Sequence, residues 1–377
     1  MIAMRTFRLE EFLGRLEFGV RHHLTASDAE NLTLDELLAM ATDEERQAYT
    51  HLRLSYIDSW GTEELREAIA GTYDEVDARH VLAFAGAEEA IFWLMQELVG
   101  PGEHAVVTVP NYQSMETVTL ATGADVSPLL MRREKGWALD LDELAGLLRP
   151  ETRLVAVNYP NNPTGHVPGQ AVFRKLVRLC DERGVRLFCD EVYRGVELDP
   201  SRTLPQAADL SPTAVSLNVM SKAYGLPGLR VGWLACRDRE LLERLEKRKH
   251  YTTICNPAVT EALAAIALHN AGRIKERNRA VIAANLPHFQ GFFGRWSDLF
   301  EWEPPVGGCV CFPRYKGAGD VEDFCRRLLE DEGVLVLPAS IYYSEIAEVP
   351  ADHFRVGMGR KGMDEALTAF DRFLRRQ

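Results

Sequence analysis

Three polar side chains that can do chemistry follow apolar runs in the middle of the chain. Asp190 and Lys222 come just after two such runs, and Asn162 lies in the turn that follows a third. An unpaired carboxylate is costly to bury, so Asp190 requires a cationic partner. A lysine amine can attack a carbonyl carbon and later move a proton. Because loops after the carboxyl ends of parallel strands border the ligand crevice of an open sheet, we expect these three residues to share one site.

The elements that must position these side chains are apolar runs separated by helix-like stretches. Strands are expected at residues 104–109, 154–158, 185–189, 214–219 and 231–236, and a helix at 171–182. Runs that are apolar throughout, without alternation, are typical of parallel strands covered on both faces. The sequence therefore predicts an α/β fold whose large domain has three layers, α/β/α, around a mostly parallel sheet.

Both ends of the chain are expected to form a second, smaller α+β domain. Helix-like stretches at 9–18 and 33–40, the latter capped by Thr33, have no place in the central sheet, and strand-like runs return near Cys309 and at 334–337. The predicted large domain spans residues 46–255. The small domain takes residues 1–45 and 285–377, and one long helix at about 256–284 links the two.

Composition limits the classes of partner. The net charge of −13 and the pI near 5.4 argue against a nucleic-acid groove or an anionic membrane surface, because both require basic surface. No apolar stretch is long enough to cross a bilayer, and the first residues do not have the pattern of a signal peptide. The seven cysteines lack paired metal-site spacing. We therefore expect a cytoplasmic protein with reduced thiols and a small-molecule ligand.

The three polar stretches also carry a family resemblance. The runs NYPNNPTG, DEVY and SKAYGLPGLRVGW resemble the motifs of the class I/II aminotransferases, which are pyridoxal-phosphate (PLP) enzymes of fold type I similar to aspartate aminotransferase. The segments 56–61, 86–90, 307–308 and 354–355 extend the resemblance in the family's order. It implies PLP as the cofactor, held by Lys222 as a Schiff base, with Asp190 paired to the pyridine nitrogen. Tyr193 and Asn162 match the partners of the ring hydroxyl oxygen.

The cofactor phosphate should lie where an apolar run passes into a helix-like stretch at 89–99. Backbone N–H groups at such a helix start hold anions. By resemblance an arginine adds a charge-assisted contact, and the serine beside Lys222 could replace the family's usual donor, for which Val219 stands here. The predicted phosphate ligands are Gly86, Ala87, Glu88, Ser221 and Arg230. Tyr56 matches a tyrosine that reaches the phosphate of a neighbouring subunit, so the resemblance implies a homodimer.

The expected substrate contacts are one arginine, one asparagine and one tryptophan. Arg355 matches the residue that takes the substrate carboxylate as a bidentate pair, and Asn162 and Trp60 are the other candidates. Tyr112 matches the aromatic residue that stacks on the cofactor ring, although it could equally be a packing residue.

The segment 18–28 departs from the family pattern, which has a glycine-containing substrate loop there. Its His22-His23 pair suggests a metal site, but adjacent histidines point in different directions and no third ligand is evident. A polar loop without metal is the favoured interpretation.

Two reaction types remain open. The first is transamination, in which an amino group moves between an amino acid and a 2-oxo acid. The second is another PLP reaction on an amino acid by a cyclase, oxidase, lyase or decarboxylase, because substrate orientation over the ring decides which bond breaks. Segments similar to 18–28 occur in such enzymes acting on arginine-like amino acids. A PLP-sensing regulator would need a DNA-binding extension that residues 1–377 leave no room for.

Overall fold

The computed structural model describes residues 4–376 and is built around a seven-stranded sheet. Its neighbouring strands, in order, are β2 (Val81–Phe84), β8 (Gly232–Ala235), β7 (Val215–Val219), β6 (Arg186–Asp190), β5 (Thr152–Asn158), β3 (His104–Val109) and β4 (Asp125–Leu130). The five strands predicted from apolar runs are all present. The other two strands were not predicted: β2 was expected only as an apolar run before a helix, and β4 has partly exposed residues that include a proline.

Strand direction places the three polar stretches at one edge of this sheet. The pairs β7–β6, β6–β5, β5–β3 and β3–β4 are parallel, whereas β8 is antiparallel to both of its neighbours. In the register, Asn158 at the end of β5 lies opposite Asp190 at the end of β6. The turns that follow β5, β6 and β7 therefore meet at the same edge, as expected for parallel strands.

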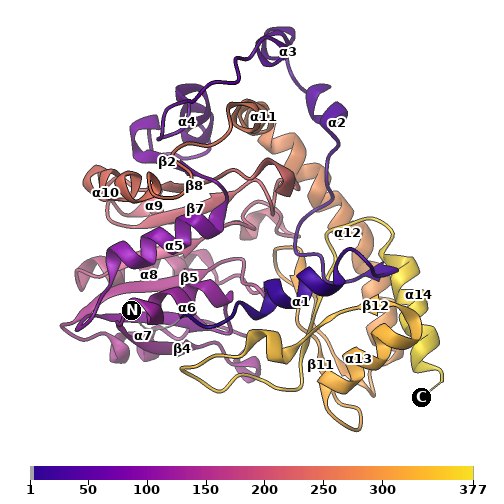
Figure 1. The fold of residues 1–377 in the computed structure, drawn as a ribbon. Helices are drawn as coiled ribbons and strands as arrows, with labels where there is room; N and C mark the ends of the chain where they lie inside the picture. The colour runs from indigo at the N-terminus through magenta and orange to yellow at the C-terminus, as the bar shows by residue number, and fades with distance from the viewer. Residues whose placement is uncertain (1–3, 377) are drawn as a thin grey trace.

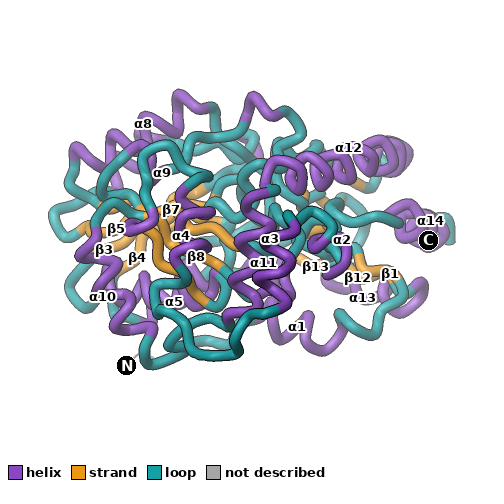
Figure 2. The backbone as a smooth tube through the Cα atoms, turned by 90° about the horizontal axis from the view of Figure 1, so that it is seen from above, coloured by secondary structure: helices purple, strands orange, loops and turns teal. Residues whose placement is uncertain are grey.

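Helices cover both faces of the sheet, and the fold class is the predicted three-layer α/β type. On one face Leu82, Ala105 and Phe188 pack with α5, α6 and α10. On the other face Val155 and Leu187 pack with α7, α8 and α9. Figure 2 shows α8 on one side of the strands and α5 and α10 on the other. These helices are α5 (Ala87–Leu98), α6 (Gln113–Ala121), α7 (Leu141–Leu147), α8 (Gln170–Glu182), α9 (Ala207–Leu210) and α10 (Arg239–Lys249).

The predicted single helix at 256–284 is wrong, because the structure has two helices there. They are α11 (Ala258–His269) and α12 (Ala271–Arg295). The chain leaves helical geometry at Asn270 (φ −106°, ψ 18°), whose side-chain amide donates to the Ile266 and Met40 carbonyls at 2.9 and 3.3 Å. An asparagine that bonds to nearby backbone in this way favours a helix end over a helix interior.

The C-terminal elements form a second packed unit beside α12 (Figure 1). A cluster of aromatic rings joins α12, α13 and α14, with Phe300 and Phe324 at its centre. The elements are β9 (Phe300–Glu301), β10 (Val310–Cys311), β11 (Arg314–Tyr315), α13 (Val321–Glu332), β12 (Val334–Leu335), β13 (Leu337–Pro338), β14 (Phe354–Gly357) and α14 (Met363–Leu374).

The N-terminal segment spans both halves of the molecule. α1 (Arg8–Leu16) packs on the C-terminal elements, and β1 (His22–His23) pairs with β12, so the two histidines form a short strand where a polar loop was expected. α2 (Leu34–Leu38) begins at the predicted Thr33 cap, and its Leu37 packs in the same cluster as Val81 of the sheet. α3 (Asp43–Thr50) and α4 (Glu63–Ala70) follow. The exact domain limits remain a prediction.

Candidate active site

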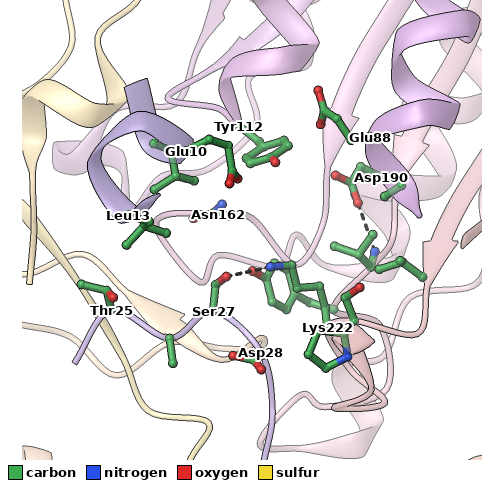
Figure 3. Close-up of a pocket in the computed structure, with 18 of the residues that line it drawn as sticks. Glu10, Leu13, Thr25, Ser27, Asp28, Glu88, Tyr112, Asn162, Asp190 and Lys222 are labelled. Carbon is green, nitrogen blue, oxygen red and sulfur yellow. Dashed lines mark hydrogen bonds between the residues drawn. The ribbon is translucent and has the colours of Figure 1, made fainter. Parts of the chain in front are cut away.

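A cavity of about 580 Å³ opens at the sheet edge where β5, β6 and β7 end. Its wall is built by the sheet half of the molecule on one side and by α1 and the segment after it on the other (Figure 3). Of the residues predicted for the site, those that line this cavity are Ala87, Glu88, Tyr112, Asn162, Asp190, Tyr193, Ser221, Lys222 and Arg230. The fold therefore brings together residues that are far apart in the chain. Ala87 and Arg230, the first and last of them, are separated by 143 positions.

Lys222 projects into the cavity from the turn after β7. Its Nζ atom donates a hydrogen bond to Ser27 Oγ at 2.7 Å (Figure 3). Burial lowers the pKa of this amine below the ordinary lysine value, and the nearby Asp28 carboxylate only partly opposes that effect. A lowered pKa increases the fraction of neutral amine, which is the form that can act as a nucleophile or as a base.

Asp190 lines the cavity with 4% of its surface exposed. The Val192 backbone N–H donates to its Oδ1 atom at 3.1 Å. Burial raises the pKa of Asp190 to about 7, while this N–H and the charge of Lys222 act in the opposite direction. No ion pair involving this carboxylate occurs within residues 4–376. A cationic ligand group beside Asp190 would therefore be strongly favoured.

Tyr193 and Asn162 present polar groups to the same space. The Tyr193 hydroxyl is buried and has no well-formed hydrogen bond within the described part of the chain. The Asn162 Oδ1 atom accepts from Arg355 Nη1 at 3.0 Å and from the Tyr342 hydroxyl at 3.2 Å. Because both donors use the amide oxygen, the Asn162 amide nitrogen is the group left to bind a ligand.

Arg355 lies behind Asn162 and does not itself line the cavity. The side chain is 1% exposed, and its Nη2 atom donates to the Thr25 carbonyl at 2.7 Å. Its Nε atom is buried without a partner in residues 4–376. A buried guanidinium without a carboxylate partner nearby can donate hydrogen bonds to a carboxylate ligand that reaches past Asn162.

The start of α5 and the turn after Lys222 form a cradle for an anion. Gly86 has φ +101°, and a Cβ atom built on it would lie 2.6 Å from Arg230 Nη2. The guanidinium is thus close to the backbone at the N-terminus of α5, with Ser221 Oγ 3.5 Å from Arg230 Nη1. Backbone N–H groups, a hydroxyl and a guanidinium together fit a phosphate group. Val219 also lines the cavity and offers no polar atom.

Trp60 and Tyr56 lie outside the cavity of this chain. The prediction of Trp60 as a substrate contact is not supported within one chain, because its carbonyl is bound by the Ala83 N–H at 3.0 Å and its indole packs on Arg239 at 4.0 Å. Tyr56 is 85% exposed, which leaves it free to reach another subunit.

Sequence reasoning did not assign several cavity residues of the N-terminal segment. They are Glu10, Glu17, His23, Thr25, Ser27 and Asp28, together with Arg360, which bonds both Asp28 carboxylate oxygens at 2.8 and 2.9 Å. Glu10 and Glu17 are seven positions apart, a spacing that puts residues on one face of a helix and could have indicated their shared direction. Within residues 4–376, His23 belongs to no group of three metal-binding side chains.

The chain is similar to several known proteins. The family model for class I and II aminotransferases matches residues 24–370. Capreomycidine synthase of Streptomyces vinaceus is 31% identical over 97% of this chain and 93% of its own length. An arginine–pyruvate transaminase of Pseudomonas aeruginosa is 34% identical over 56% of this chain and 54% of its own. Among solved structures, a PLP-dependent aminotransferase from Streptococcus suis has a TM-score of 0.92 at 27% identity, covering 100% of this chain and 99% of its own. The PLP-dependent cyclase OrfR has a TM-score of 0.90 at 28% identity, covering 100% and 98%.

Proposed function

Because the chain belongs to the class I and II aminotransferase family, a PLP-dependent enzyme family, we propose that it moves an amino group between an amino acid and a 2-oxo acid. The observation that carries this proposal is the placement of the Lys222 amine and the Asp190 carboxyl group in one cavity beside an anion cradle.

The residues present fit the cofactor. The buried Tyr193 hydroxyl lacks a well-formed hydrogen bond in the described structure and suits the oxygen of the cofactor ring. The Asp190 carboxyl group, whose pKa burial raises, suits a protonated pyridine nitrogen. The cradle at Gly86 and Arg230 suits the phosphate, since a side chain at residue 86 would fill it. Lys222 would hold the aldehyde carbon through its amine.

Each residue then has a defined task. When bound, PLP supplies an electron sink for the bond broken at the substrate Cα atom. The Lys222 amine takes the Cα proton and returns it, which requires the amine to be neutral when it acts as a base. Arg355, which donates to Asn162, and the Asn162 amide would bind the substrate carboxylate, and the Tyr112 ring in the cavity wall would offer an aromatic face to the cofactor. Asp190 would keep a bound pyridine nitrogen protonated.

The part of the cavity wall that would face the substrate side chain favours a cationic amino acid. Figure 3 shows Glu10 of α1 facing the cavity from the side opposite Asp190. Glu17 also lines this region, and Asp28 is already neutralised by Arg360. The Glu17 carboxylate lies 3.6 Å from His23, but burial lowers the pKa of that imidazole and so favours its neutral form. The Glu10 and Glu17 carboxylates would therefore attract a guanidinium or ammonium group. The similarity to an arginine–pyruvate transaminase supports the same substrate class.

A second candidate function is cyclisation of an arginine-like amino acid. It is favoured by the similarity to capreomycidine synthase over 97% of the chain and by the structural similarity to the cyclase OrfR. Either reaction could begin with proton removal at Cα by Lys222, in which case the residues near the sheet edge would serve both.

Borohydride fixation tests the shared chemistry. We expect the wild-type protein to absorb in the visible range with PLP and to retain the cofactor covalently after borohydride, with the adduct on the Lys222 peptide. Lys222→Ala should lose the adduct, whereas Lys175→Ala, which removes an exposed lysine on α8, should keep it. A covalent adduct that persists in Lys222→Ala would contradict the proposal.

A product screen separates the two reactions. Arginine and hydroxylated arginines, supplied with and without pyruvate, should give a 2-oxo acid plus alanine if the enzyme is a transaminase. A cyclised product that retains the α-nitrogen and needs no oxo acid would instead establish the cyclase. Mass analysis of the products distinguishes them directly.

A further inference from the structure

We propose that Ser27 is a positioning residue for Lys222: its hydroxyl holds the lysine amine in place while that amine takes and returns the Cα proton. This inference rests on the function proposed above, and it concerns a segment in which the chain departs from the family's sequence pattern. The Lys222 Nζ to Ser27 Oγ distance of 2.7 Å is that of a well-formed hydrogen bond.

The segment that carries Ser27 is tied to the backbone of Lys222 itself. The Ala29 N–H donates to the Lys222 carbonyl at 3.2 Å, two residues after Ser27. Asp28, the next residue after Ser27, is bound through both carboxylate oxygens to Arg360. The backbone on the C-terminal side of Ser27 is therefore held beside Lys222 by an ion pair and a backbone hydrogen bond.

The other end of this segment is fixed to β14. The Gly357 N–H donates to the Leu24 carbonyl at 2.7 Å, and Arg355 donates to the Thr25 carbonyl at 2.7 Å. The backbones are so close that a Cβ atom on Gly357 would lie 2.0 Å from the Ala26 carbonyl oxygen. Residues 24–29 thus form one segment that contacts both Arg355, the predicted substrate-binding arginine, and Lys222.

A hydroxyl suits this task better than a carboxylate would. A serine oxygen accepts from a protonated amine, and its O–H can donate to a neutral amine, so it can hold Lys222 in both protonation states. A carboxylate such as Asp28 would favour the charged form strongly over the neutral one, and Arg360 already engages it. The charged and titratable groups that face the Lys222 amine are Asp28, Arg355, Cys309 and Glu10, with Asp190 and Tyr193 across the cavity.

The Tyr193 hydroxyl lies close enough to Ser27 for the serine to act on its pKa. Ser27 thus stands between the lysine that moves the proton and the tyrosine predicted to bind the ring oxygen. Its side chain is partly exposed to the cavity, where the reaction would take place.

The experiment compares Ser27→Ala with Ser27→Thr, which keeps the hydroxyl, and with Ser201→Ala, an exposed control. The readout is exchange of the substrate Cα hydrogen in deuterated water. We expect Ser27→Ala to slow exchange by roughly tenfold, part of the 10²–10⁴ that positioned proton transfer contributes. Cofactor affinity and the KM for the amino acid should change by less than about twofold, and Ser27→Thr should recover most of the rate.

A second readout needs no cofactor. In the cofactor-free full chain, reductive methylation followed by peptide mapping measures the reactivity of the Lys222 amine against pH. Ser27→Ala should shift that profile to lower pH, because the charged amine loses an acceptor. If wild-type protein fixes PLP on Lys222 but Ser27→Ala matches wild type in exchange and labelling, the proposed role of Ser27 is refuted and the proposed function stands. If wild-type protein does not fix PLP on Lys222, the proposed function fails.

Discussion

At the scale of single residues, loss of solvation raises the pKa of three carboxyl groups to about 7, but only two of these groups face the cavity. Burial raises the pKa of Asp190, Glu191 and Glu88 alike. Glu191 accepts from the Ala207 N–H and the Ser216 hydroxyl, both at 2.8 Å, and does not line the cavity, so its role is structural. Asp190 has a single backbone N–H donor and faces the ligand space. A raised pKa identifies a functional carboxylate only together with such geometry.

Asp190→Asn should stabilise the protein without cofactor. The folded-state pKa of about 7 exceeds the ordinary value of 3.8, so the folded chain holds a proton that the unfolded chain releases. This carboxyl group therefore lowers the free energy of unfolding progressively between about pH 4 and pH 7, and by a constant amount above. We expect the variant to gain up to a few kcal/mol at pH 8.5 and less at pH 5.5.

Urea unfolding of the cofactor-free proteins at the two pH values measures this difference. Asp298→Asn, which removes an exposed carboxylate, serves as the control and should show no comparable pH-dependent gain. The cofactor affinity of Asp190→Asn should fall at the same time. A variant that is less stable than wild type at pH 8.5 would contradict the expectation.

At the scale of elements, α1 closes the side of the cavity that faces the substrate side chain. Leu9 packs with Ile341 and Tyr342 of the C-terminal unit, while Glu10 turns toward the cavity. The segment before α1 is anchored by a 2.9 Å ion pair between Arg5 and the buried Glu116. Because α1 is held at one end by the sheet half and along one face by the C-terminal half, it fixes the distance from the acidic side chains to Lys222.

Glu10→Gln and Glu17→Gln should reduce selectivity for cationic amino acids. Each variant removes a negative charge from the cavity wall, so we expect the KM for arginine-like substrates to rise about tenfold, with a smaller change for neutral amino acids. Glu11→Gln is the matched control on the same helix, because Glu11 is exposed and pairs with Arg15 away from the cavity. Equal changes for cationic and neutral substrates would show that the acids do not select charge.

At the scale of the whole molecule, several large apolar side chains remain exposed near the sheet half. They are Leu54, Tyr56, Tyr251 and Ile254, with exposed fractions of 87, 85, 89 and 50%. Lys249 donates to the Ser59 carbonyl at 2.6 Å and so links the two loops that carry them. Apolar side chains grouped on the surface are typical of an interface between subunits. Tyr56 is the residue predicted to reach the neighbouring phosphate site.

We therefore expect a homodimer with twice the 42.4 kDa chain mass, measured by sedimentation. Leu54→Asp should shift it toward monomer and weaken PLP binding, since each site would lose Tyr56 of the other subunit. Phe18→Asp, at a residue 93% exposed beyond the end of α1, should leave the dimer intact. A wild-type monomer that binds PLP tightly would exclude a shared site.

Within residues 4–376 no helix has the length and apolar character to cross a bilayer.

The sequence by itself determined the fold class, the strands that end at the site, and the identity of its lysine, acid and amide, because these depend on local runs and on motifs that keep the same spacing wherever they occur. Only the tertiary structure decided which residues of the N-terminal and C-terminal segments contact these site residues. Ser27 meets Lys222 across 195 positions, and Arg360 meets Asp28 across 332. Such contacts leave no periodic trace in the chain, since packing and strand order create them. The break at Asn270 was likewise set by its side-chain hydrogen bonds, including one to Met40 far away in the sequence.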